Sequence, residues 1–115
     1  MSVFTDQLDQ ASAATRSLGC VGLDPDPARL PVSSVYEFNR AIVDATKDLV
    51  CAYKPNMAHY EALGLPGLAA LEATISYIRA EAPGVVVVSD AKRGDIGHAN
   101  QHYARALFDV WGFDA

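Results

Sequence analysis

Four consecutive valines at positions 85–88 constrain the fold of this chain more than any other feature. Valine is β-branched and favours strands, and a run of valines without polar alternation is typical of a parallel strand that is buried on both faces. Polar residues, beginning with Ser89 and Asp90, follow the run at once. The run therefore predicts a buried parallel strand that ends at a polar loop.

The same succession of a short apolar run and a polar loop occurs twice earlier in the chain. Residues 20–23 are apolar and stop at residues 24–27, whose prolines cannot continue a strand ladder. Residues 50–53 are apolar and stop at residues 54–56, which read Lys-Pro-Asn. Residues 112–115 look like the opening of another strand. Three strands and the start of a fourth are therefore predicted.

Helical patterns lie before and between these runs. A leading helix is expected within residues 3–18, which are mildly apolar, and we expect it to pack outside the first strand. Ser34 and Glu37 have the spacing of a capping box. This pair predicts a helix from about Val35 to about Lys47 or Leu49.

The next helix is indicated by one apolar stripe and by a stop at Pro83-Gly84. Its stripe consists of Leu68, Leu71, Ile75, Ile78 and Ala82. A further helix is expected from about Gly97 to Val110. Strands that alternate with helices in this way predict an α/β fold with a parallel sheet.

An open doubly wound sheet and a closed barrel both fit this alternation. Four charged residues favour the barrel, because they directly follow the predicted strands, where barrel active sites are assembled. These residues are Asp24, Lys54, Asp90 and Lys92. We therefore expect residues 1–115 to be the N-terminal part of a single (β/α)8 barrel domain, with about three βα units and a leading helix. A complete barrel needs about 250 residues, so we expect this domain to be incomplete.

Charge and hydropathy exclude several classes of partner. The net charge is -5 and the basic residues form no run, so no nucleic acid is expected as a partner. No stretch of about 20 apolar residues occurs, and residues 1–10 carry acids where a signal peptide would carry bases. We expect a cytoplasmic protein that acts on a small molecule. Cys20 and Cys51 are expected to be buried, reduced thiols.

A cluster of candidate catalytic residues directly follows the four valines. Asp90, Lys92 and Asp95 form the spacing D-x-K-x-x-D, and Lys54 would approach from the neighbouring strand. If the chain is still extended, Asp90 and Lys92 point to the same face. Opposite charges within about 4 to 6 Å keep one another ionised, so Lys92 is a candidate general acid. A surface ion-pair network at a strand end is the alternative.

Other polar residues have simpler explanations. Lys54 could be a solvated loop lysine, and Asp24 could cap its own proline-rich loop. Three histidines lack companions at metal-ligand spacing, so no metal site is predicted. They are His59, His98 and His102. Neither a dinucleotide-binding G-x-G-x-x-G nor a nucleophile-elbow G-x-S-x-G occurs in the chain.

Three blocks of the chain resemble the orotidine 5'-phosphate decarboxylase family, in the subgroup with a DAKRGDIG-type motif. The blocks are residues 21–26 (VGLDPD), 53–56 (YKPN) and 90–97 (DAKRGDIG). The three blocks in this order indicate the family more specifically than the last motif alone, because related enzymes that act on sugar phosphates have a similar motif there. The resemblance implies a homodimeric barrel that converts orotidine 5'-phosphate to UMP and carbon dioxide in de novo pyrimidine synthesis. It also implies that no metal or cofactor takes part.

The same resemblance implies roles for individual residues. Lys92 would protonate the ring carbon that loses its carboxylate, and Asp90 would lie beside that carboxylate. Lys54 would bind the ribose and help to fix the charged array, while Asp24 would also hydrogen-bond the ribose. Asp95 would reach across the dimer interface into the site of the partner.

The chain departs from the family pattern in two respects. Ile96 is expected to bind substrate. After it, His98 and Ala99 stand where the family usually has Asn and then Thr, so a hydroxyl that would contact the substrate is missing. The segments that would bind the 5'-phosphate belong to the second half of such a barrel. We therefore expect this chain to be inactive or very weak alone, and its unpaired sheet edge predicts self-association.

Two other functions are considered. A related sugar-phosphate decarboxylase or hexulose-phosphate synthase would need a metal-binding carboxylate near the second strand, where this chain has Lys54. A half-barrel without catalysis, which serves only in assembly or binding, is the alternative from a different class.

Overall fold

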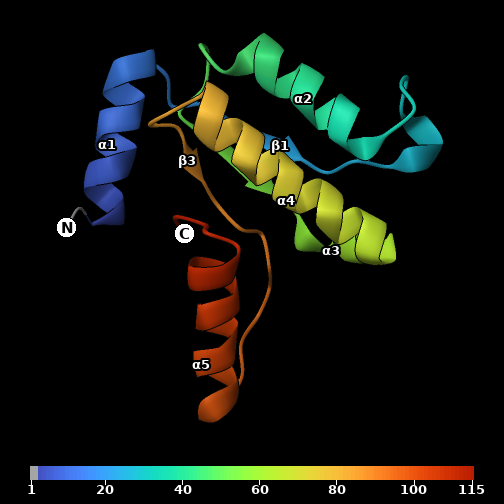
Figure 1. Cartoon of the computed structure of the whole chain (residues 1–115). Helices are drawn as coiled ribbons and strands as arrows, with labels where there is room; N and C mark the ends of the chain where they lie inside the picture. The colour runs from blue at the N-terminus through green and yellow to red at the C-terminus, as the bar shows by residue number, and fades with distance from the viewer. Residues whose placement is uncertain (1–2) are drawn as a thin grey trace.

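The structure is a computed structural model that describes residues 3–115. Helices alternate with short strands along the chain (Figure 1). The elements are α1 (Phe4–Thr15), β1 (Cys20–Leu23), η1 (Pro27–Arg29), α2 (Val35–Thr46), β2 (Ala52–Pro55), α3 (Met57–Glu61), α4 (Gly64–Glu81), β3 (Val86–Val87), α5 (His98–Ala104) and η2 (Arg105–Val110). The predicted α/β class is confirmed.

The three strands form one parallel sheet in the order β1-β2-β3. Cys20 pairs with Ala52, and Ala52 pairs with Val86 on its other side. No strand is assigned to residues 112–115, where the opening of a strand was expected. The segment nevertheless runs along β3, because the Asp114 amide donates to the Val87 carbonyl at 2.8 Å. A fourth strand position is thus marked beside β3.

The main core lies on the face of the sheet that α2 and α4 cover. Leu23, Tyr53 and Val87 point to this face and are almost completely buried. They pack against a set of helix residues: Val43, Leu71, Ile75 and Ile78. Because side chains alternate along a strand, the neighbouring positions point to the opposite side, here called the inner face. Burial of Leu23, Tyr53 and Val87 in the main core therefore places the alternate residues of each strand on the inner face.

A leading helix is present, but its expected position was wrong. Ala11 of α1 is buried together with Ala52 and Val86, and partly buried Phe4 and Leu8 join them. These contacts place α1 on the inner face at the start of β2 and β3, and not outside β1. Figure 1 shows α1 on the other side of β3 from α4. Small side chains such as Ala52 allow the helix to approach the sheet closely.

Helix boundaries agree with the sequence patterns where a cap is present. The Glu37 amide donates to the Ser34 hydroxyl at 3.1 Å, so α2 begins where the capping box predicted. The helix expected from about Gly97 to Val110 occurs as α5 followed by η2. In η2 the hydrogen bonds widen to a π-helix, and the Trp111 amide donates to the Ala106 carbonyl at 2.9 Å.

A buried polar network joins α2, α3 and α4 to the end of β1. The Asn39 side-chain amide donates to the Tyr60 hydroxyl at 3.0 Å and to the Thr74 hydroxyl at 3.1 Å. Tyr60 in turn donates to the carbonyl of Leu23 at 2.9 Å. Burial raises the pKa of Tyr60, so its hydroxyl stays protonated as this donation requires. The network fixes the backbone immediately before Asp24.

The two cysteines differ in exposure. Cys51 is buried as expected, but Cys20 is exposed, so the expectation for Cys20 was wrong. Cys20 belongs to the strand positions that point to the inner face, where α1 covers Ala52 and Val86 and leaves the thiol open. Both cysteines are free.

Among residues 3–115, no helix is both long enough and apolar enough to cross a membrane.

Candidate active site

The inner face presents its charged residues toward the C-terminal ends of the strands. Lys54 lies within β2 between two buried residues, Tyr53 and Pro55, and is itself exposed. Its side chain therefore points to the inner face. Beyond the strands, Asn56 pairs with Asp90 in the same parallel register. Lys54 was expected to follow the strand, but it belongs to the strand, which orients it more firmly than a loop would.

Asp90 and Lys92 form the ion pair that the motif predicted. The Lys92 ammonium donates to Asp90 Oδ1. This hydrogen bond and the positive charges of Lys92 and Lys54 hold the pKa of Asp90 below its usual value, although partial desolvation opposes them. The carboxylate side chain is 23% exposed and the lysine side chain 74%. The carboxylate form of Asp90 is therefore favoured, and the Lys92 ammonium beside it is accessible to a ligand.

The backbone at this pair is not extended as expected. Asp90 continues the ladder, since its amide donates to the Pro55 carbonyl at 3.0 Å and its carbonyl accepts from the Met57 amide at 3.1 Å. Lys92, however, has a φ of 52°, in the left-handed region. The two side chains meet because the chain turns back at Lys92, and not because both project from one strand.

Asp24 lies beside a histidine that the sequence did not connect with it. Asp24 Oδ2 is 3.9 Å from His59 Nε2, and His59 Nδ1 is 3.2 Å from the Pro25 carbonyl. The loop cap considered for Asp24 is made by Asp26, whose Oδ1 accepts from the Ala28 amide at 3.0 Å. The Asp24 carboxylate is thus not used by its own loop and stays partly open to solvent.

The structure does not bring Asp95 and Ile96 to the other site residues. Asp95 is exposed and accepts from the Ile96 amide at 2.7 Å, and its own amide donates to Asn100 at 2.7 Å. The Ile96 side chain is 87% exposed. Within the described chain, neither residue has a hydrogen bond or ion pair with Asp90, Lys92 or Lys54.

Glu61 and Arg93 were not singled out from the sequence. The Arg93 guanidinium pairs through Nη2 with the Glu61 carboxylate and donates through Nη1 to the Ala91 carbonyl at 2.7 Å. Thirty-two residues separate the two charges in the sequence, so no local pattern could have joined them. Arg93 directly follows Lys92 in the sequence, whereas Glu61 reaches Arg93 from the end of α3.

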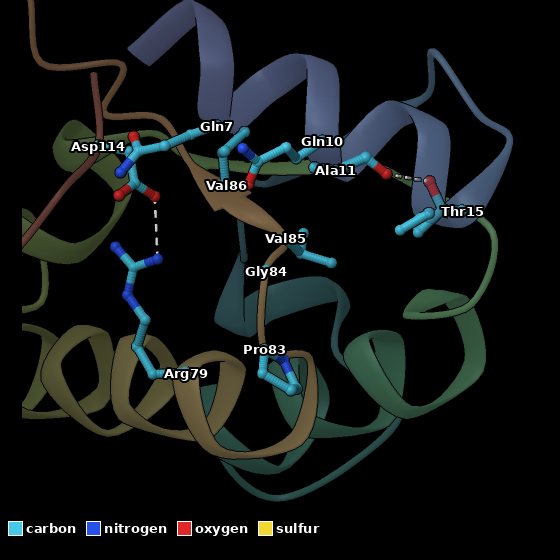
Figure 2. A pocket seen from close by; sticks show the side chains of 11 residues that line it. Gln7, Gln10, Ala11, Thr15, Arg79, Pro83, Gly84, Val85, Val86 and Asp114 are labelled. Carbon is cyan, nitrogen blue, oxygen red and sulfur yellow. Dashed lines mark hydrogen bonds and ion pairs between the residues drawn. The ribbon is translucent and has the colours of Figure 1, made fainter. Parts of the chain in front are cut away.

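A cavity of about 300 Å³ lies at the opposite end of the sheet (Figure 2). Residues from α1 and from the start of β3 line it, and Arg79 is paired with Asp114 at 2.9 Å on one side. The charged residues of the candidate site are not among its lining residues. Barrel active sites form at the C-terminal ends of strands, so we assign the chemistry to the end that carries Lys92.

The sequence of this chain matches a known protein family. The sequence pattern of the orotidine 5'-phosphate decarboxylase / HUMPS family matches residues 18–114. The chain belongs to this family. The matched segment includes all three blocks that carried the resemblance in the sequence.

Curated relatives in the family support the match over almost the whole chain. A protein from Herpetosiphon aurantiacus named orotidine 5'-phosphate decarboxylase is 51% identical over 98% of this chain and 43% of the relative. One from Ralstonia pickettii with the same name is 51% identical over 97% of this chain and 43% of the relative. The chain therefore spans less than half the length of these relatives.

Solved structures from the family show the same fold. The orotidine 5'-monophosphate decarboxylase of Leishmania donovani has a TM-score of 0.83 and 34% identity, and the match covers 98% of this chain and 42% of that one. The UMP synthase of the same organism has a TM-score of 0.84 and 37% identity, with 98% and 24% covered. The expected fold, the N-terminal portion of a (β/α)8 barrel, is confirmed.

Proposed function

We propose that this protein decarboxylates orotidine 5'-phosphate to UMP and carbon dioxide in de novo pyrimidine synthesis. In this proposal the chain supplies the part of the active site that binds the ribose and delivers the proton. The observation that carries it is the ion pair of Asp90 and Lys92 at the C-terminal end of the sheet, with Lys54 on the same face. Family membership supports the same assignment.

The reaction needs a proton where a carboxylate leaves. The bond between the pyrimidine C6 and its carboxylate breaks, and the electron pair remains on C6. The Lys92 ammonium then gives a proton to C6, and solvent reprotonates the neutral lysine. A positive charge that is already aimed at C6 stabilises the negative charge that develops there, and such fixed electrostatic stabilisation is a large term in catalysis.

The other site residues would act on binding. Asp24 and Lys54 hydrogen-bond the ribose, and Asp90 lies beside the departing carboxylate. Asp95 is exposed, which is consistent with a contact to the substrate of a second subunit in a homodimer. The resemblance to the family is the reason to assign this role to Asp95, and exposed Ile96 is proposed to bind substrate.

The proposal extends to the setting of the protein. Residues 1–115 form the N-terminal part of a single barrel domain, and the protein acts in the cytoplasm without a metal or cofactor. Segments that complete the barrel would bind the 5'-phosphate, and much of the rate would come from that remote binding energy. The exposure of Lys54 on the inner face supports a site that is completed by segments outside this chain.

The first experiment measures the ultraviolet absorbance of orotidine 5'-phosphate during incubation with the protein. The chain is assayed alone and after it is joined to the remaining length of the Herpetosiphon aurantiacus relative. We expect the joined protein to decarboxylate the substrate and the chain alone to show far less activity. Absence of turnover in the joined protein, with the fold intact by circular dichroism, would contradict the proposed function.

Lys92→Ala in the joined protein tests the proton donor. We expect a loss of turnover of at least about 100-fold, the lower range for a positioned acid. Lys47→Ala is the matched control, because Lys47 is the C-cap of α2 and pairs with Glu81, and both residues precede the start of a strand rather than follow its end. Turnover close to the parent rate in Lys92→Ala would exclude Lys92 as the proton donor.

A further inference from the structure

Lys92 adopts a backbone conformation that its side chain disfavours. Its φ of 52° lies in the left-handed region, where the Cβ of a residue other than glycine crowds the backbone. Such a conformation persists only where the surrounding structure holds it. The contacts on either side of Lys92 therefore decide where its ammonium points.

The first contact fixes the chain before Lys92. The Asp90 carbonyl accepts from the amide of Met57, the first residue of α3, at 3.1 Å. Met57 is buried in the main core, so this end of α3 is held firmly. The backbone of Asp90 is thereby fixed to the helix.

The second contact fixes the chain after Lys92. Glu61 is the last residue of α3, and its carboxylate pairs with Arg93. The same guanidinium donates from its other nitrogen to the Ala91 carbonyl at 2.7 Å. Arg93 thus closes the turn around Lys92 and ties it to the far end of α3. One short helix holds the turn on both sides.

We propose that Glu61 and Arg93 are positioning residues that hold Lys92 in its left-handed turn and aim its ammonium at Asp90. The catalytic consequence rests on the proposed function, but the conformational role does not. Many exposed ion pairs have little effect, and Glu61 is 44% exposed. This pair differs because its arginine also bonds the backbone of the turn that it closes.

The test is NMR spectroscopy on the chain with Glu61→Gln and Arg93→Gln. A residue with positive φ gives a strong intraresidue cross-peak between its amide and α protons, and we expect this peak for Lys92 to weaken in both variants. Glu81→Gln is the matched control. It breaks the pair of Lys47 and Glu81, whose side chains are 30% and 49% exposed, against 30% and 44% for Arg93 and Glu61. The control is expected to leave Lys92 unchanged.

The carboxyl carbon of Asp90 gives a second readout. If the ammonium of Lys92 no longer points at the Asp90 carboxylate, we expect the pKa of Asp90 to rise toward its ordinary value in both variants. The amide spectrum of the rest of the chain shows whether each variant is folded. Folded variants that retain both the Lys92 cross-peak and the Asp90 titration of the parent would overturn the proposal.

Turnover in the joined protein separates this proposal from the proposed function. Misplacing Lys92 should lower kcat on the order of tenfold to 100-fold. KM should change little, because the residues proposed to bind the ribose, Asp24 and Lys54, lie outside this turn. A parent protein that decarboxylates nothing would contradict the proposed function alone, since the two NMR readouts do not depend on activity. Unchanged kcat with an altered Lys92 cross-peak would overturn the catalytic consequence.

Discussion

At the scale of single residues, the charge state of Asp90 depends on its neighbours. Lys92→Met removes the hydrogen bond and the nearer positive charge, so we expect the pKa of Asp90 to rise toward its ordinary value. Titration of the Asp90 carboxyl carbon by NMR measures the change. An unaltered Asp90 titration would mean that Lys54 alone sets this pKa.

The sign of the accompanying pH dependence follows from the lowered pKa. A carboxyl group whose pKa is lower in the folded than in the unfolded protein stabilises the fold above its unfolded pKa. This contribution is lost as the pH falls through the folded pKa. The difference in free energy of unfolding between the parent and Lys92→Met should therefore be larger at neutral pH than in acid. Denaturant titrations at the two pH values check this.

Sequence reasoning reached residues joined by a local motif or placed at the ends of neighbouring predicted strands, such as Lys92 and Lys54, and missed contacts that arise only from packing. Asp90 and Lys92 are two residues apart, and their contact follows from a local motif. His59 and Pro25 are 34 residues apart, so the histidine meets the loop of Asp24 only through the packing of α3. A single sequence contains no signal for such a pair.

At the scale of elements, β1 lies at the expected residues 20–23, whereas β2 is displaced along the chain. The strand expected at residues 50–53 occurs at Ala52–Pro55, because a lysine on an open face does not end a strand. The short helix α3 was not predicted, since five residues are too few to show a helical period. The capping box, in contrast, placed the start of α2 correctly because a cap is a local interaction.

The contact between α3 and α4 depends on Gly67. A methyl group there would overlap the carbonyl oxygen of Tyr60 and the Cβ of Leu63. Gly67→Ala should therefore destabilise the protein by about 1–3 kcal/mol, more than the gain of about 1 kcal/mol in helix propensity. Gly94→Ala is the control, because no atom lies near its added methyl group. Equal unfolding midpoints for the two variants in urea would contradict the close contact.

At the scale of the whole molecule, large apolar side chains at several places in the chain are open to solvent. Several large apolar side chains are more than half exposed: Leu18, Ile96, Leu65, Val110 and Leu49. Within residues 3–115, β1 pairs only with β2, which leaves one edge of the sheet without a partner. An unpaired strand edge favours association with another chain, and exposed apolar side chains add to this tendency.

We therefore expect the sedimentation coefficient of the chain to rise with its concentration. Leu18→Glu should reduce this rise, because Leu18 is 91% exposed and lies just before β1. Ser76→Glu adds the same charge on an exposed position of α4 and serves as the control. A sedimentation coefficient that stays constant with concentration in the parent would contradict this prediction.

The choice between a barrel and an open sheet was the limit of the sequence argument. Three parallel strands with helices between them satisfy both architectures, because closure is a property of strands that come later in a barrel. The charged residues at the strand ends favoured the barrel, and solved relatives confirmed it.

The exposed thiol of Cys20 has a practical consequence. It lies on the inner face, and desolvation raises its pKa while the charge of Lys54 partly offsets this effect. Cys51 is buried, so a maleimide probe in mildly alkaline buffer should label Cys20 and leave Cys51 unmodified. Anything that covers the inner face, whether the remaining strands of a barrel or a second chain, will slow that labelling. Closure of the barrel can therefore be followed in real time as the protection of one natural thiol.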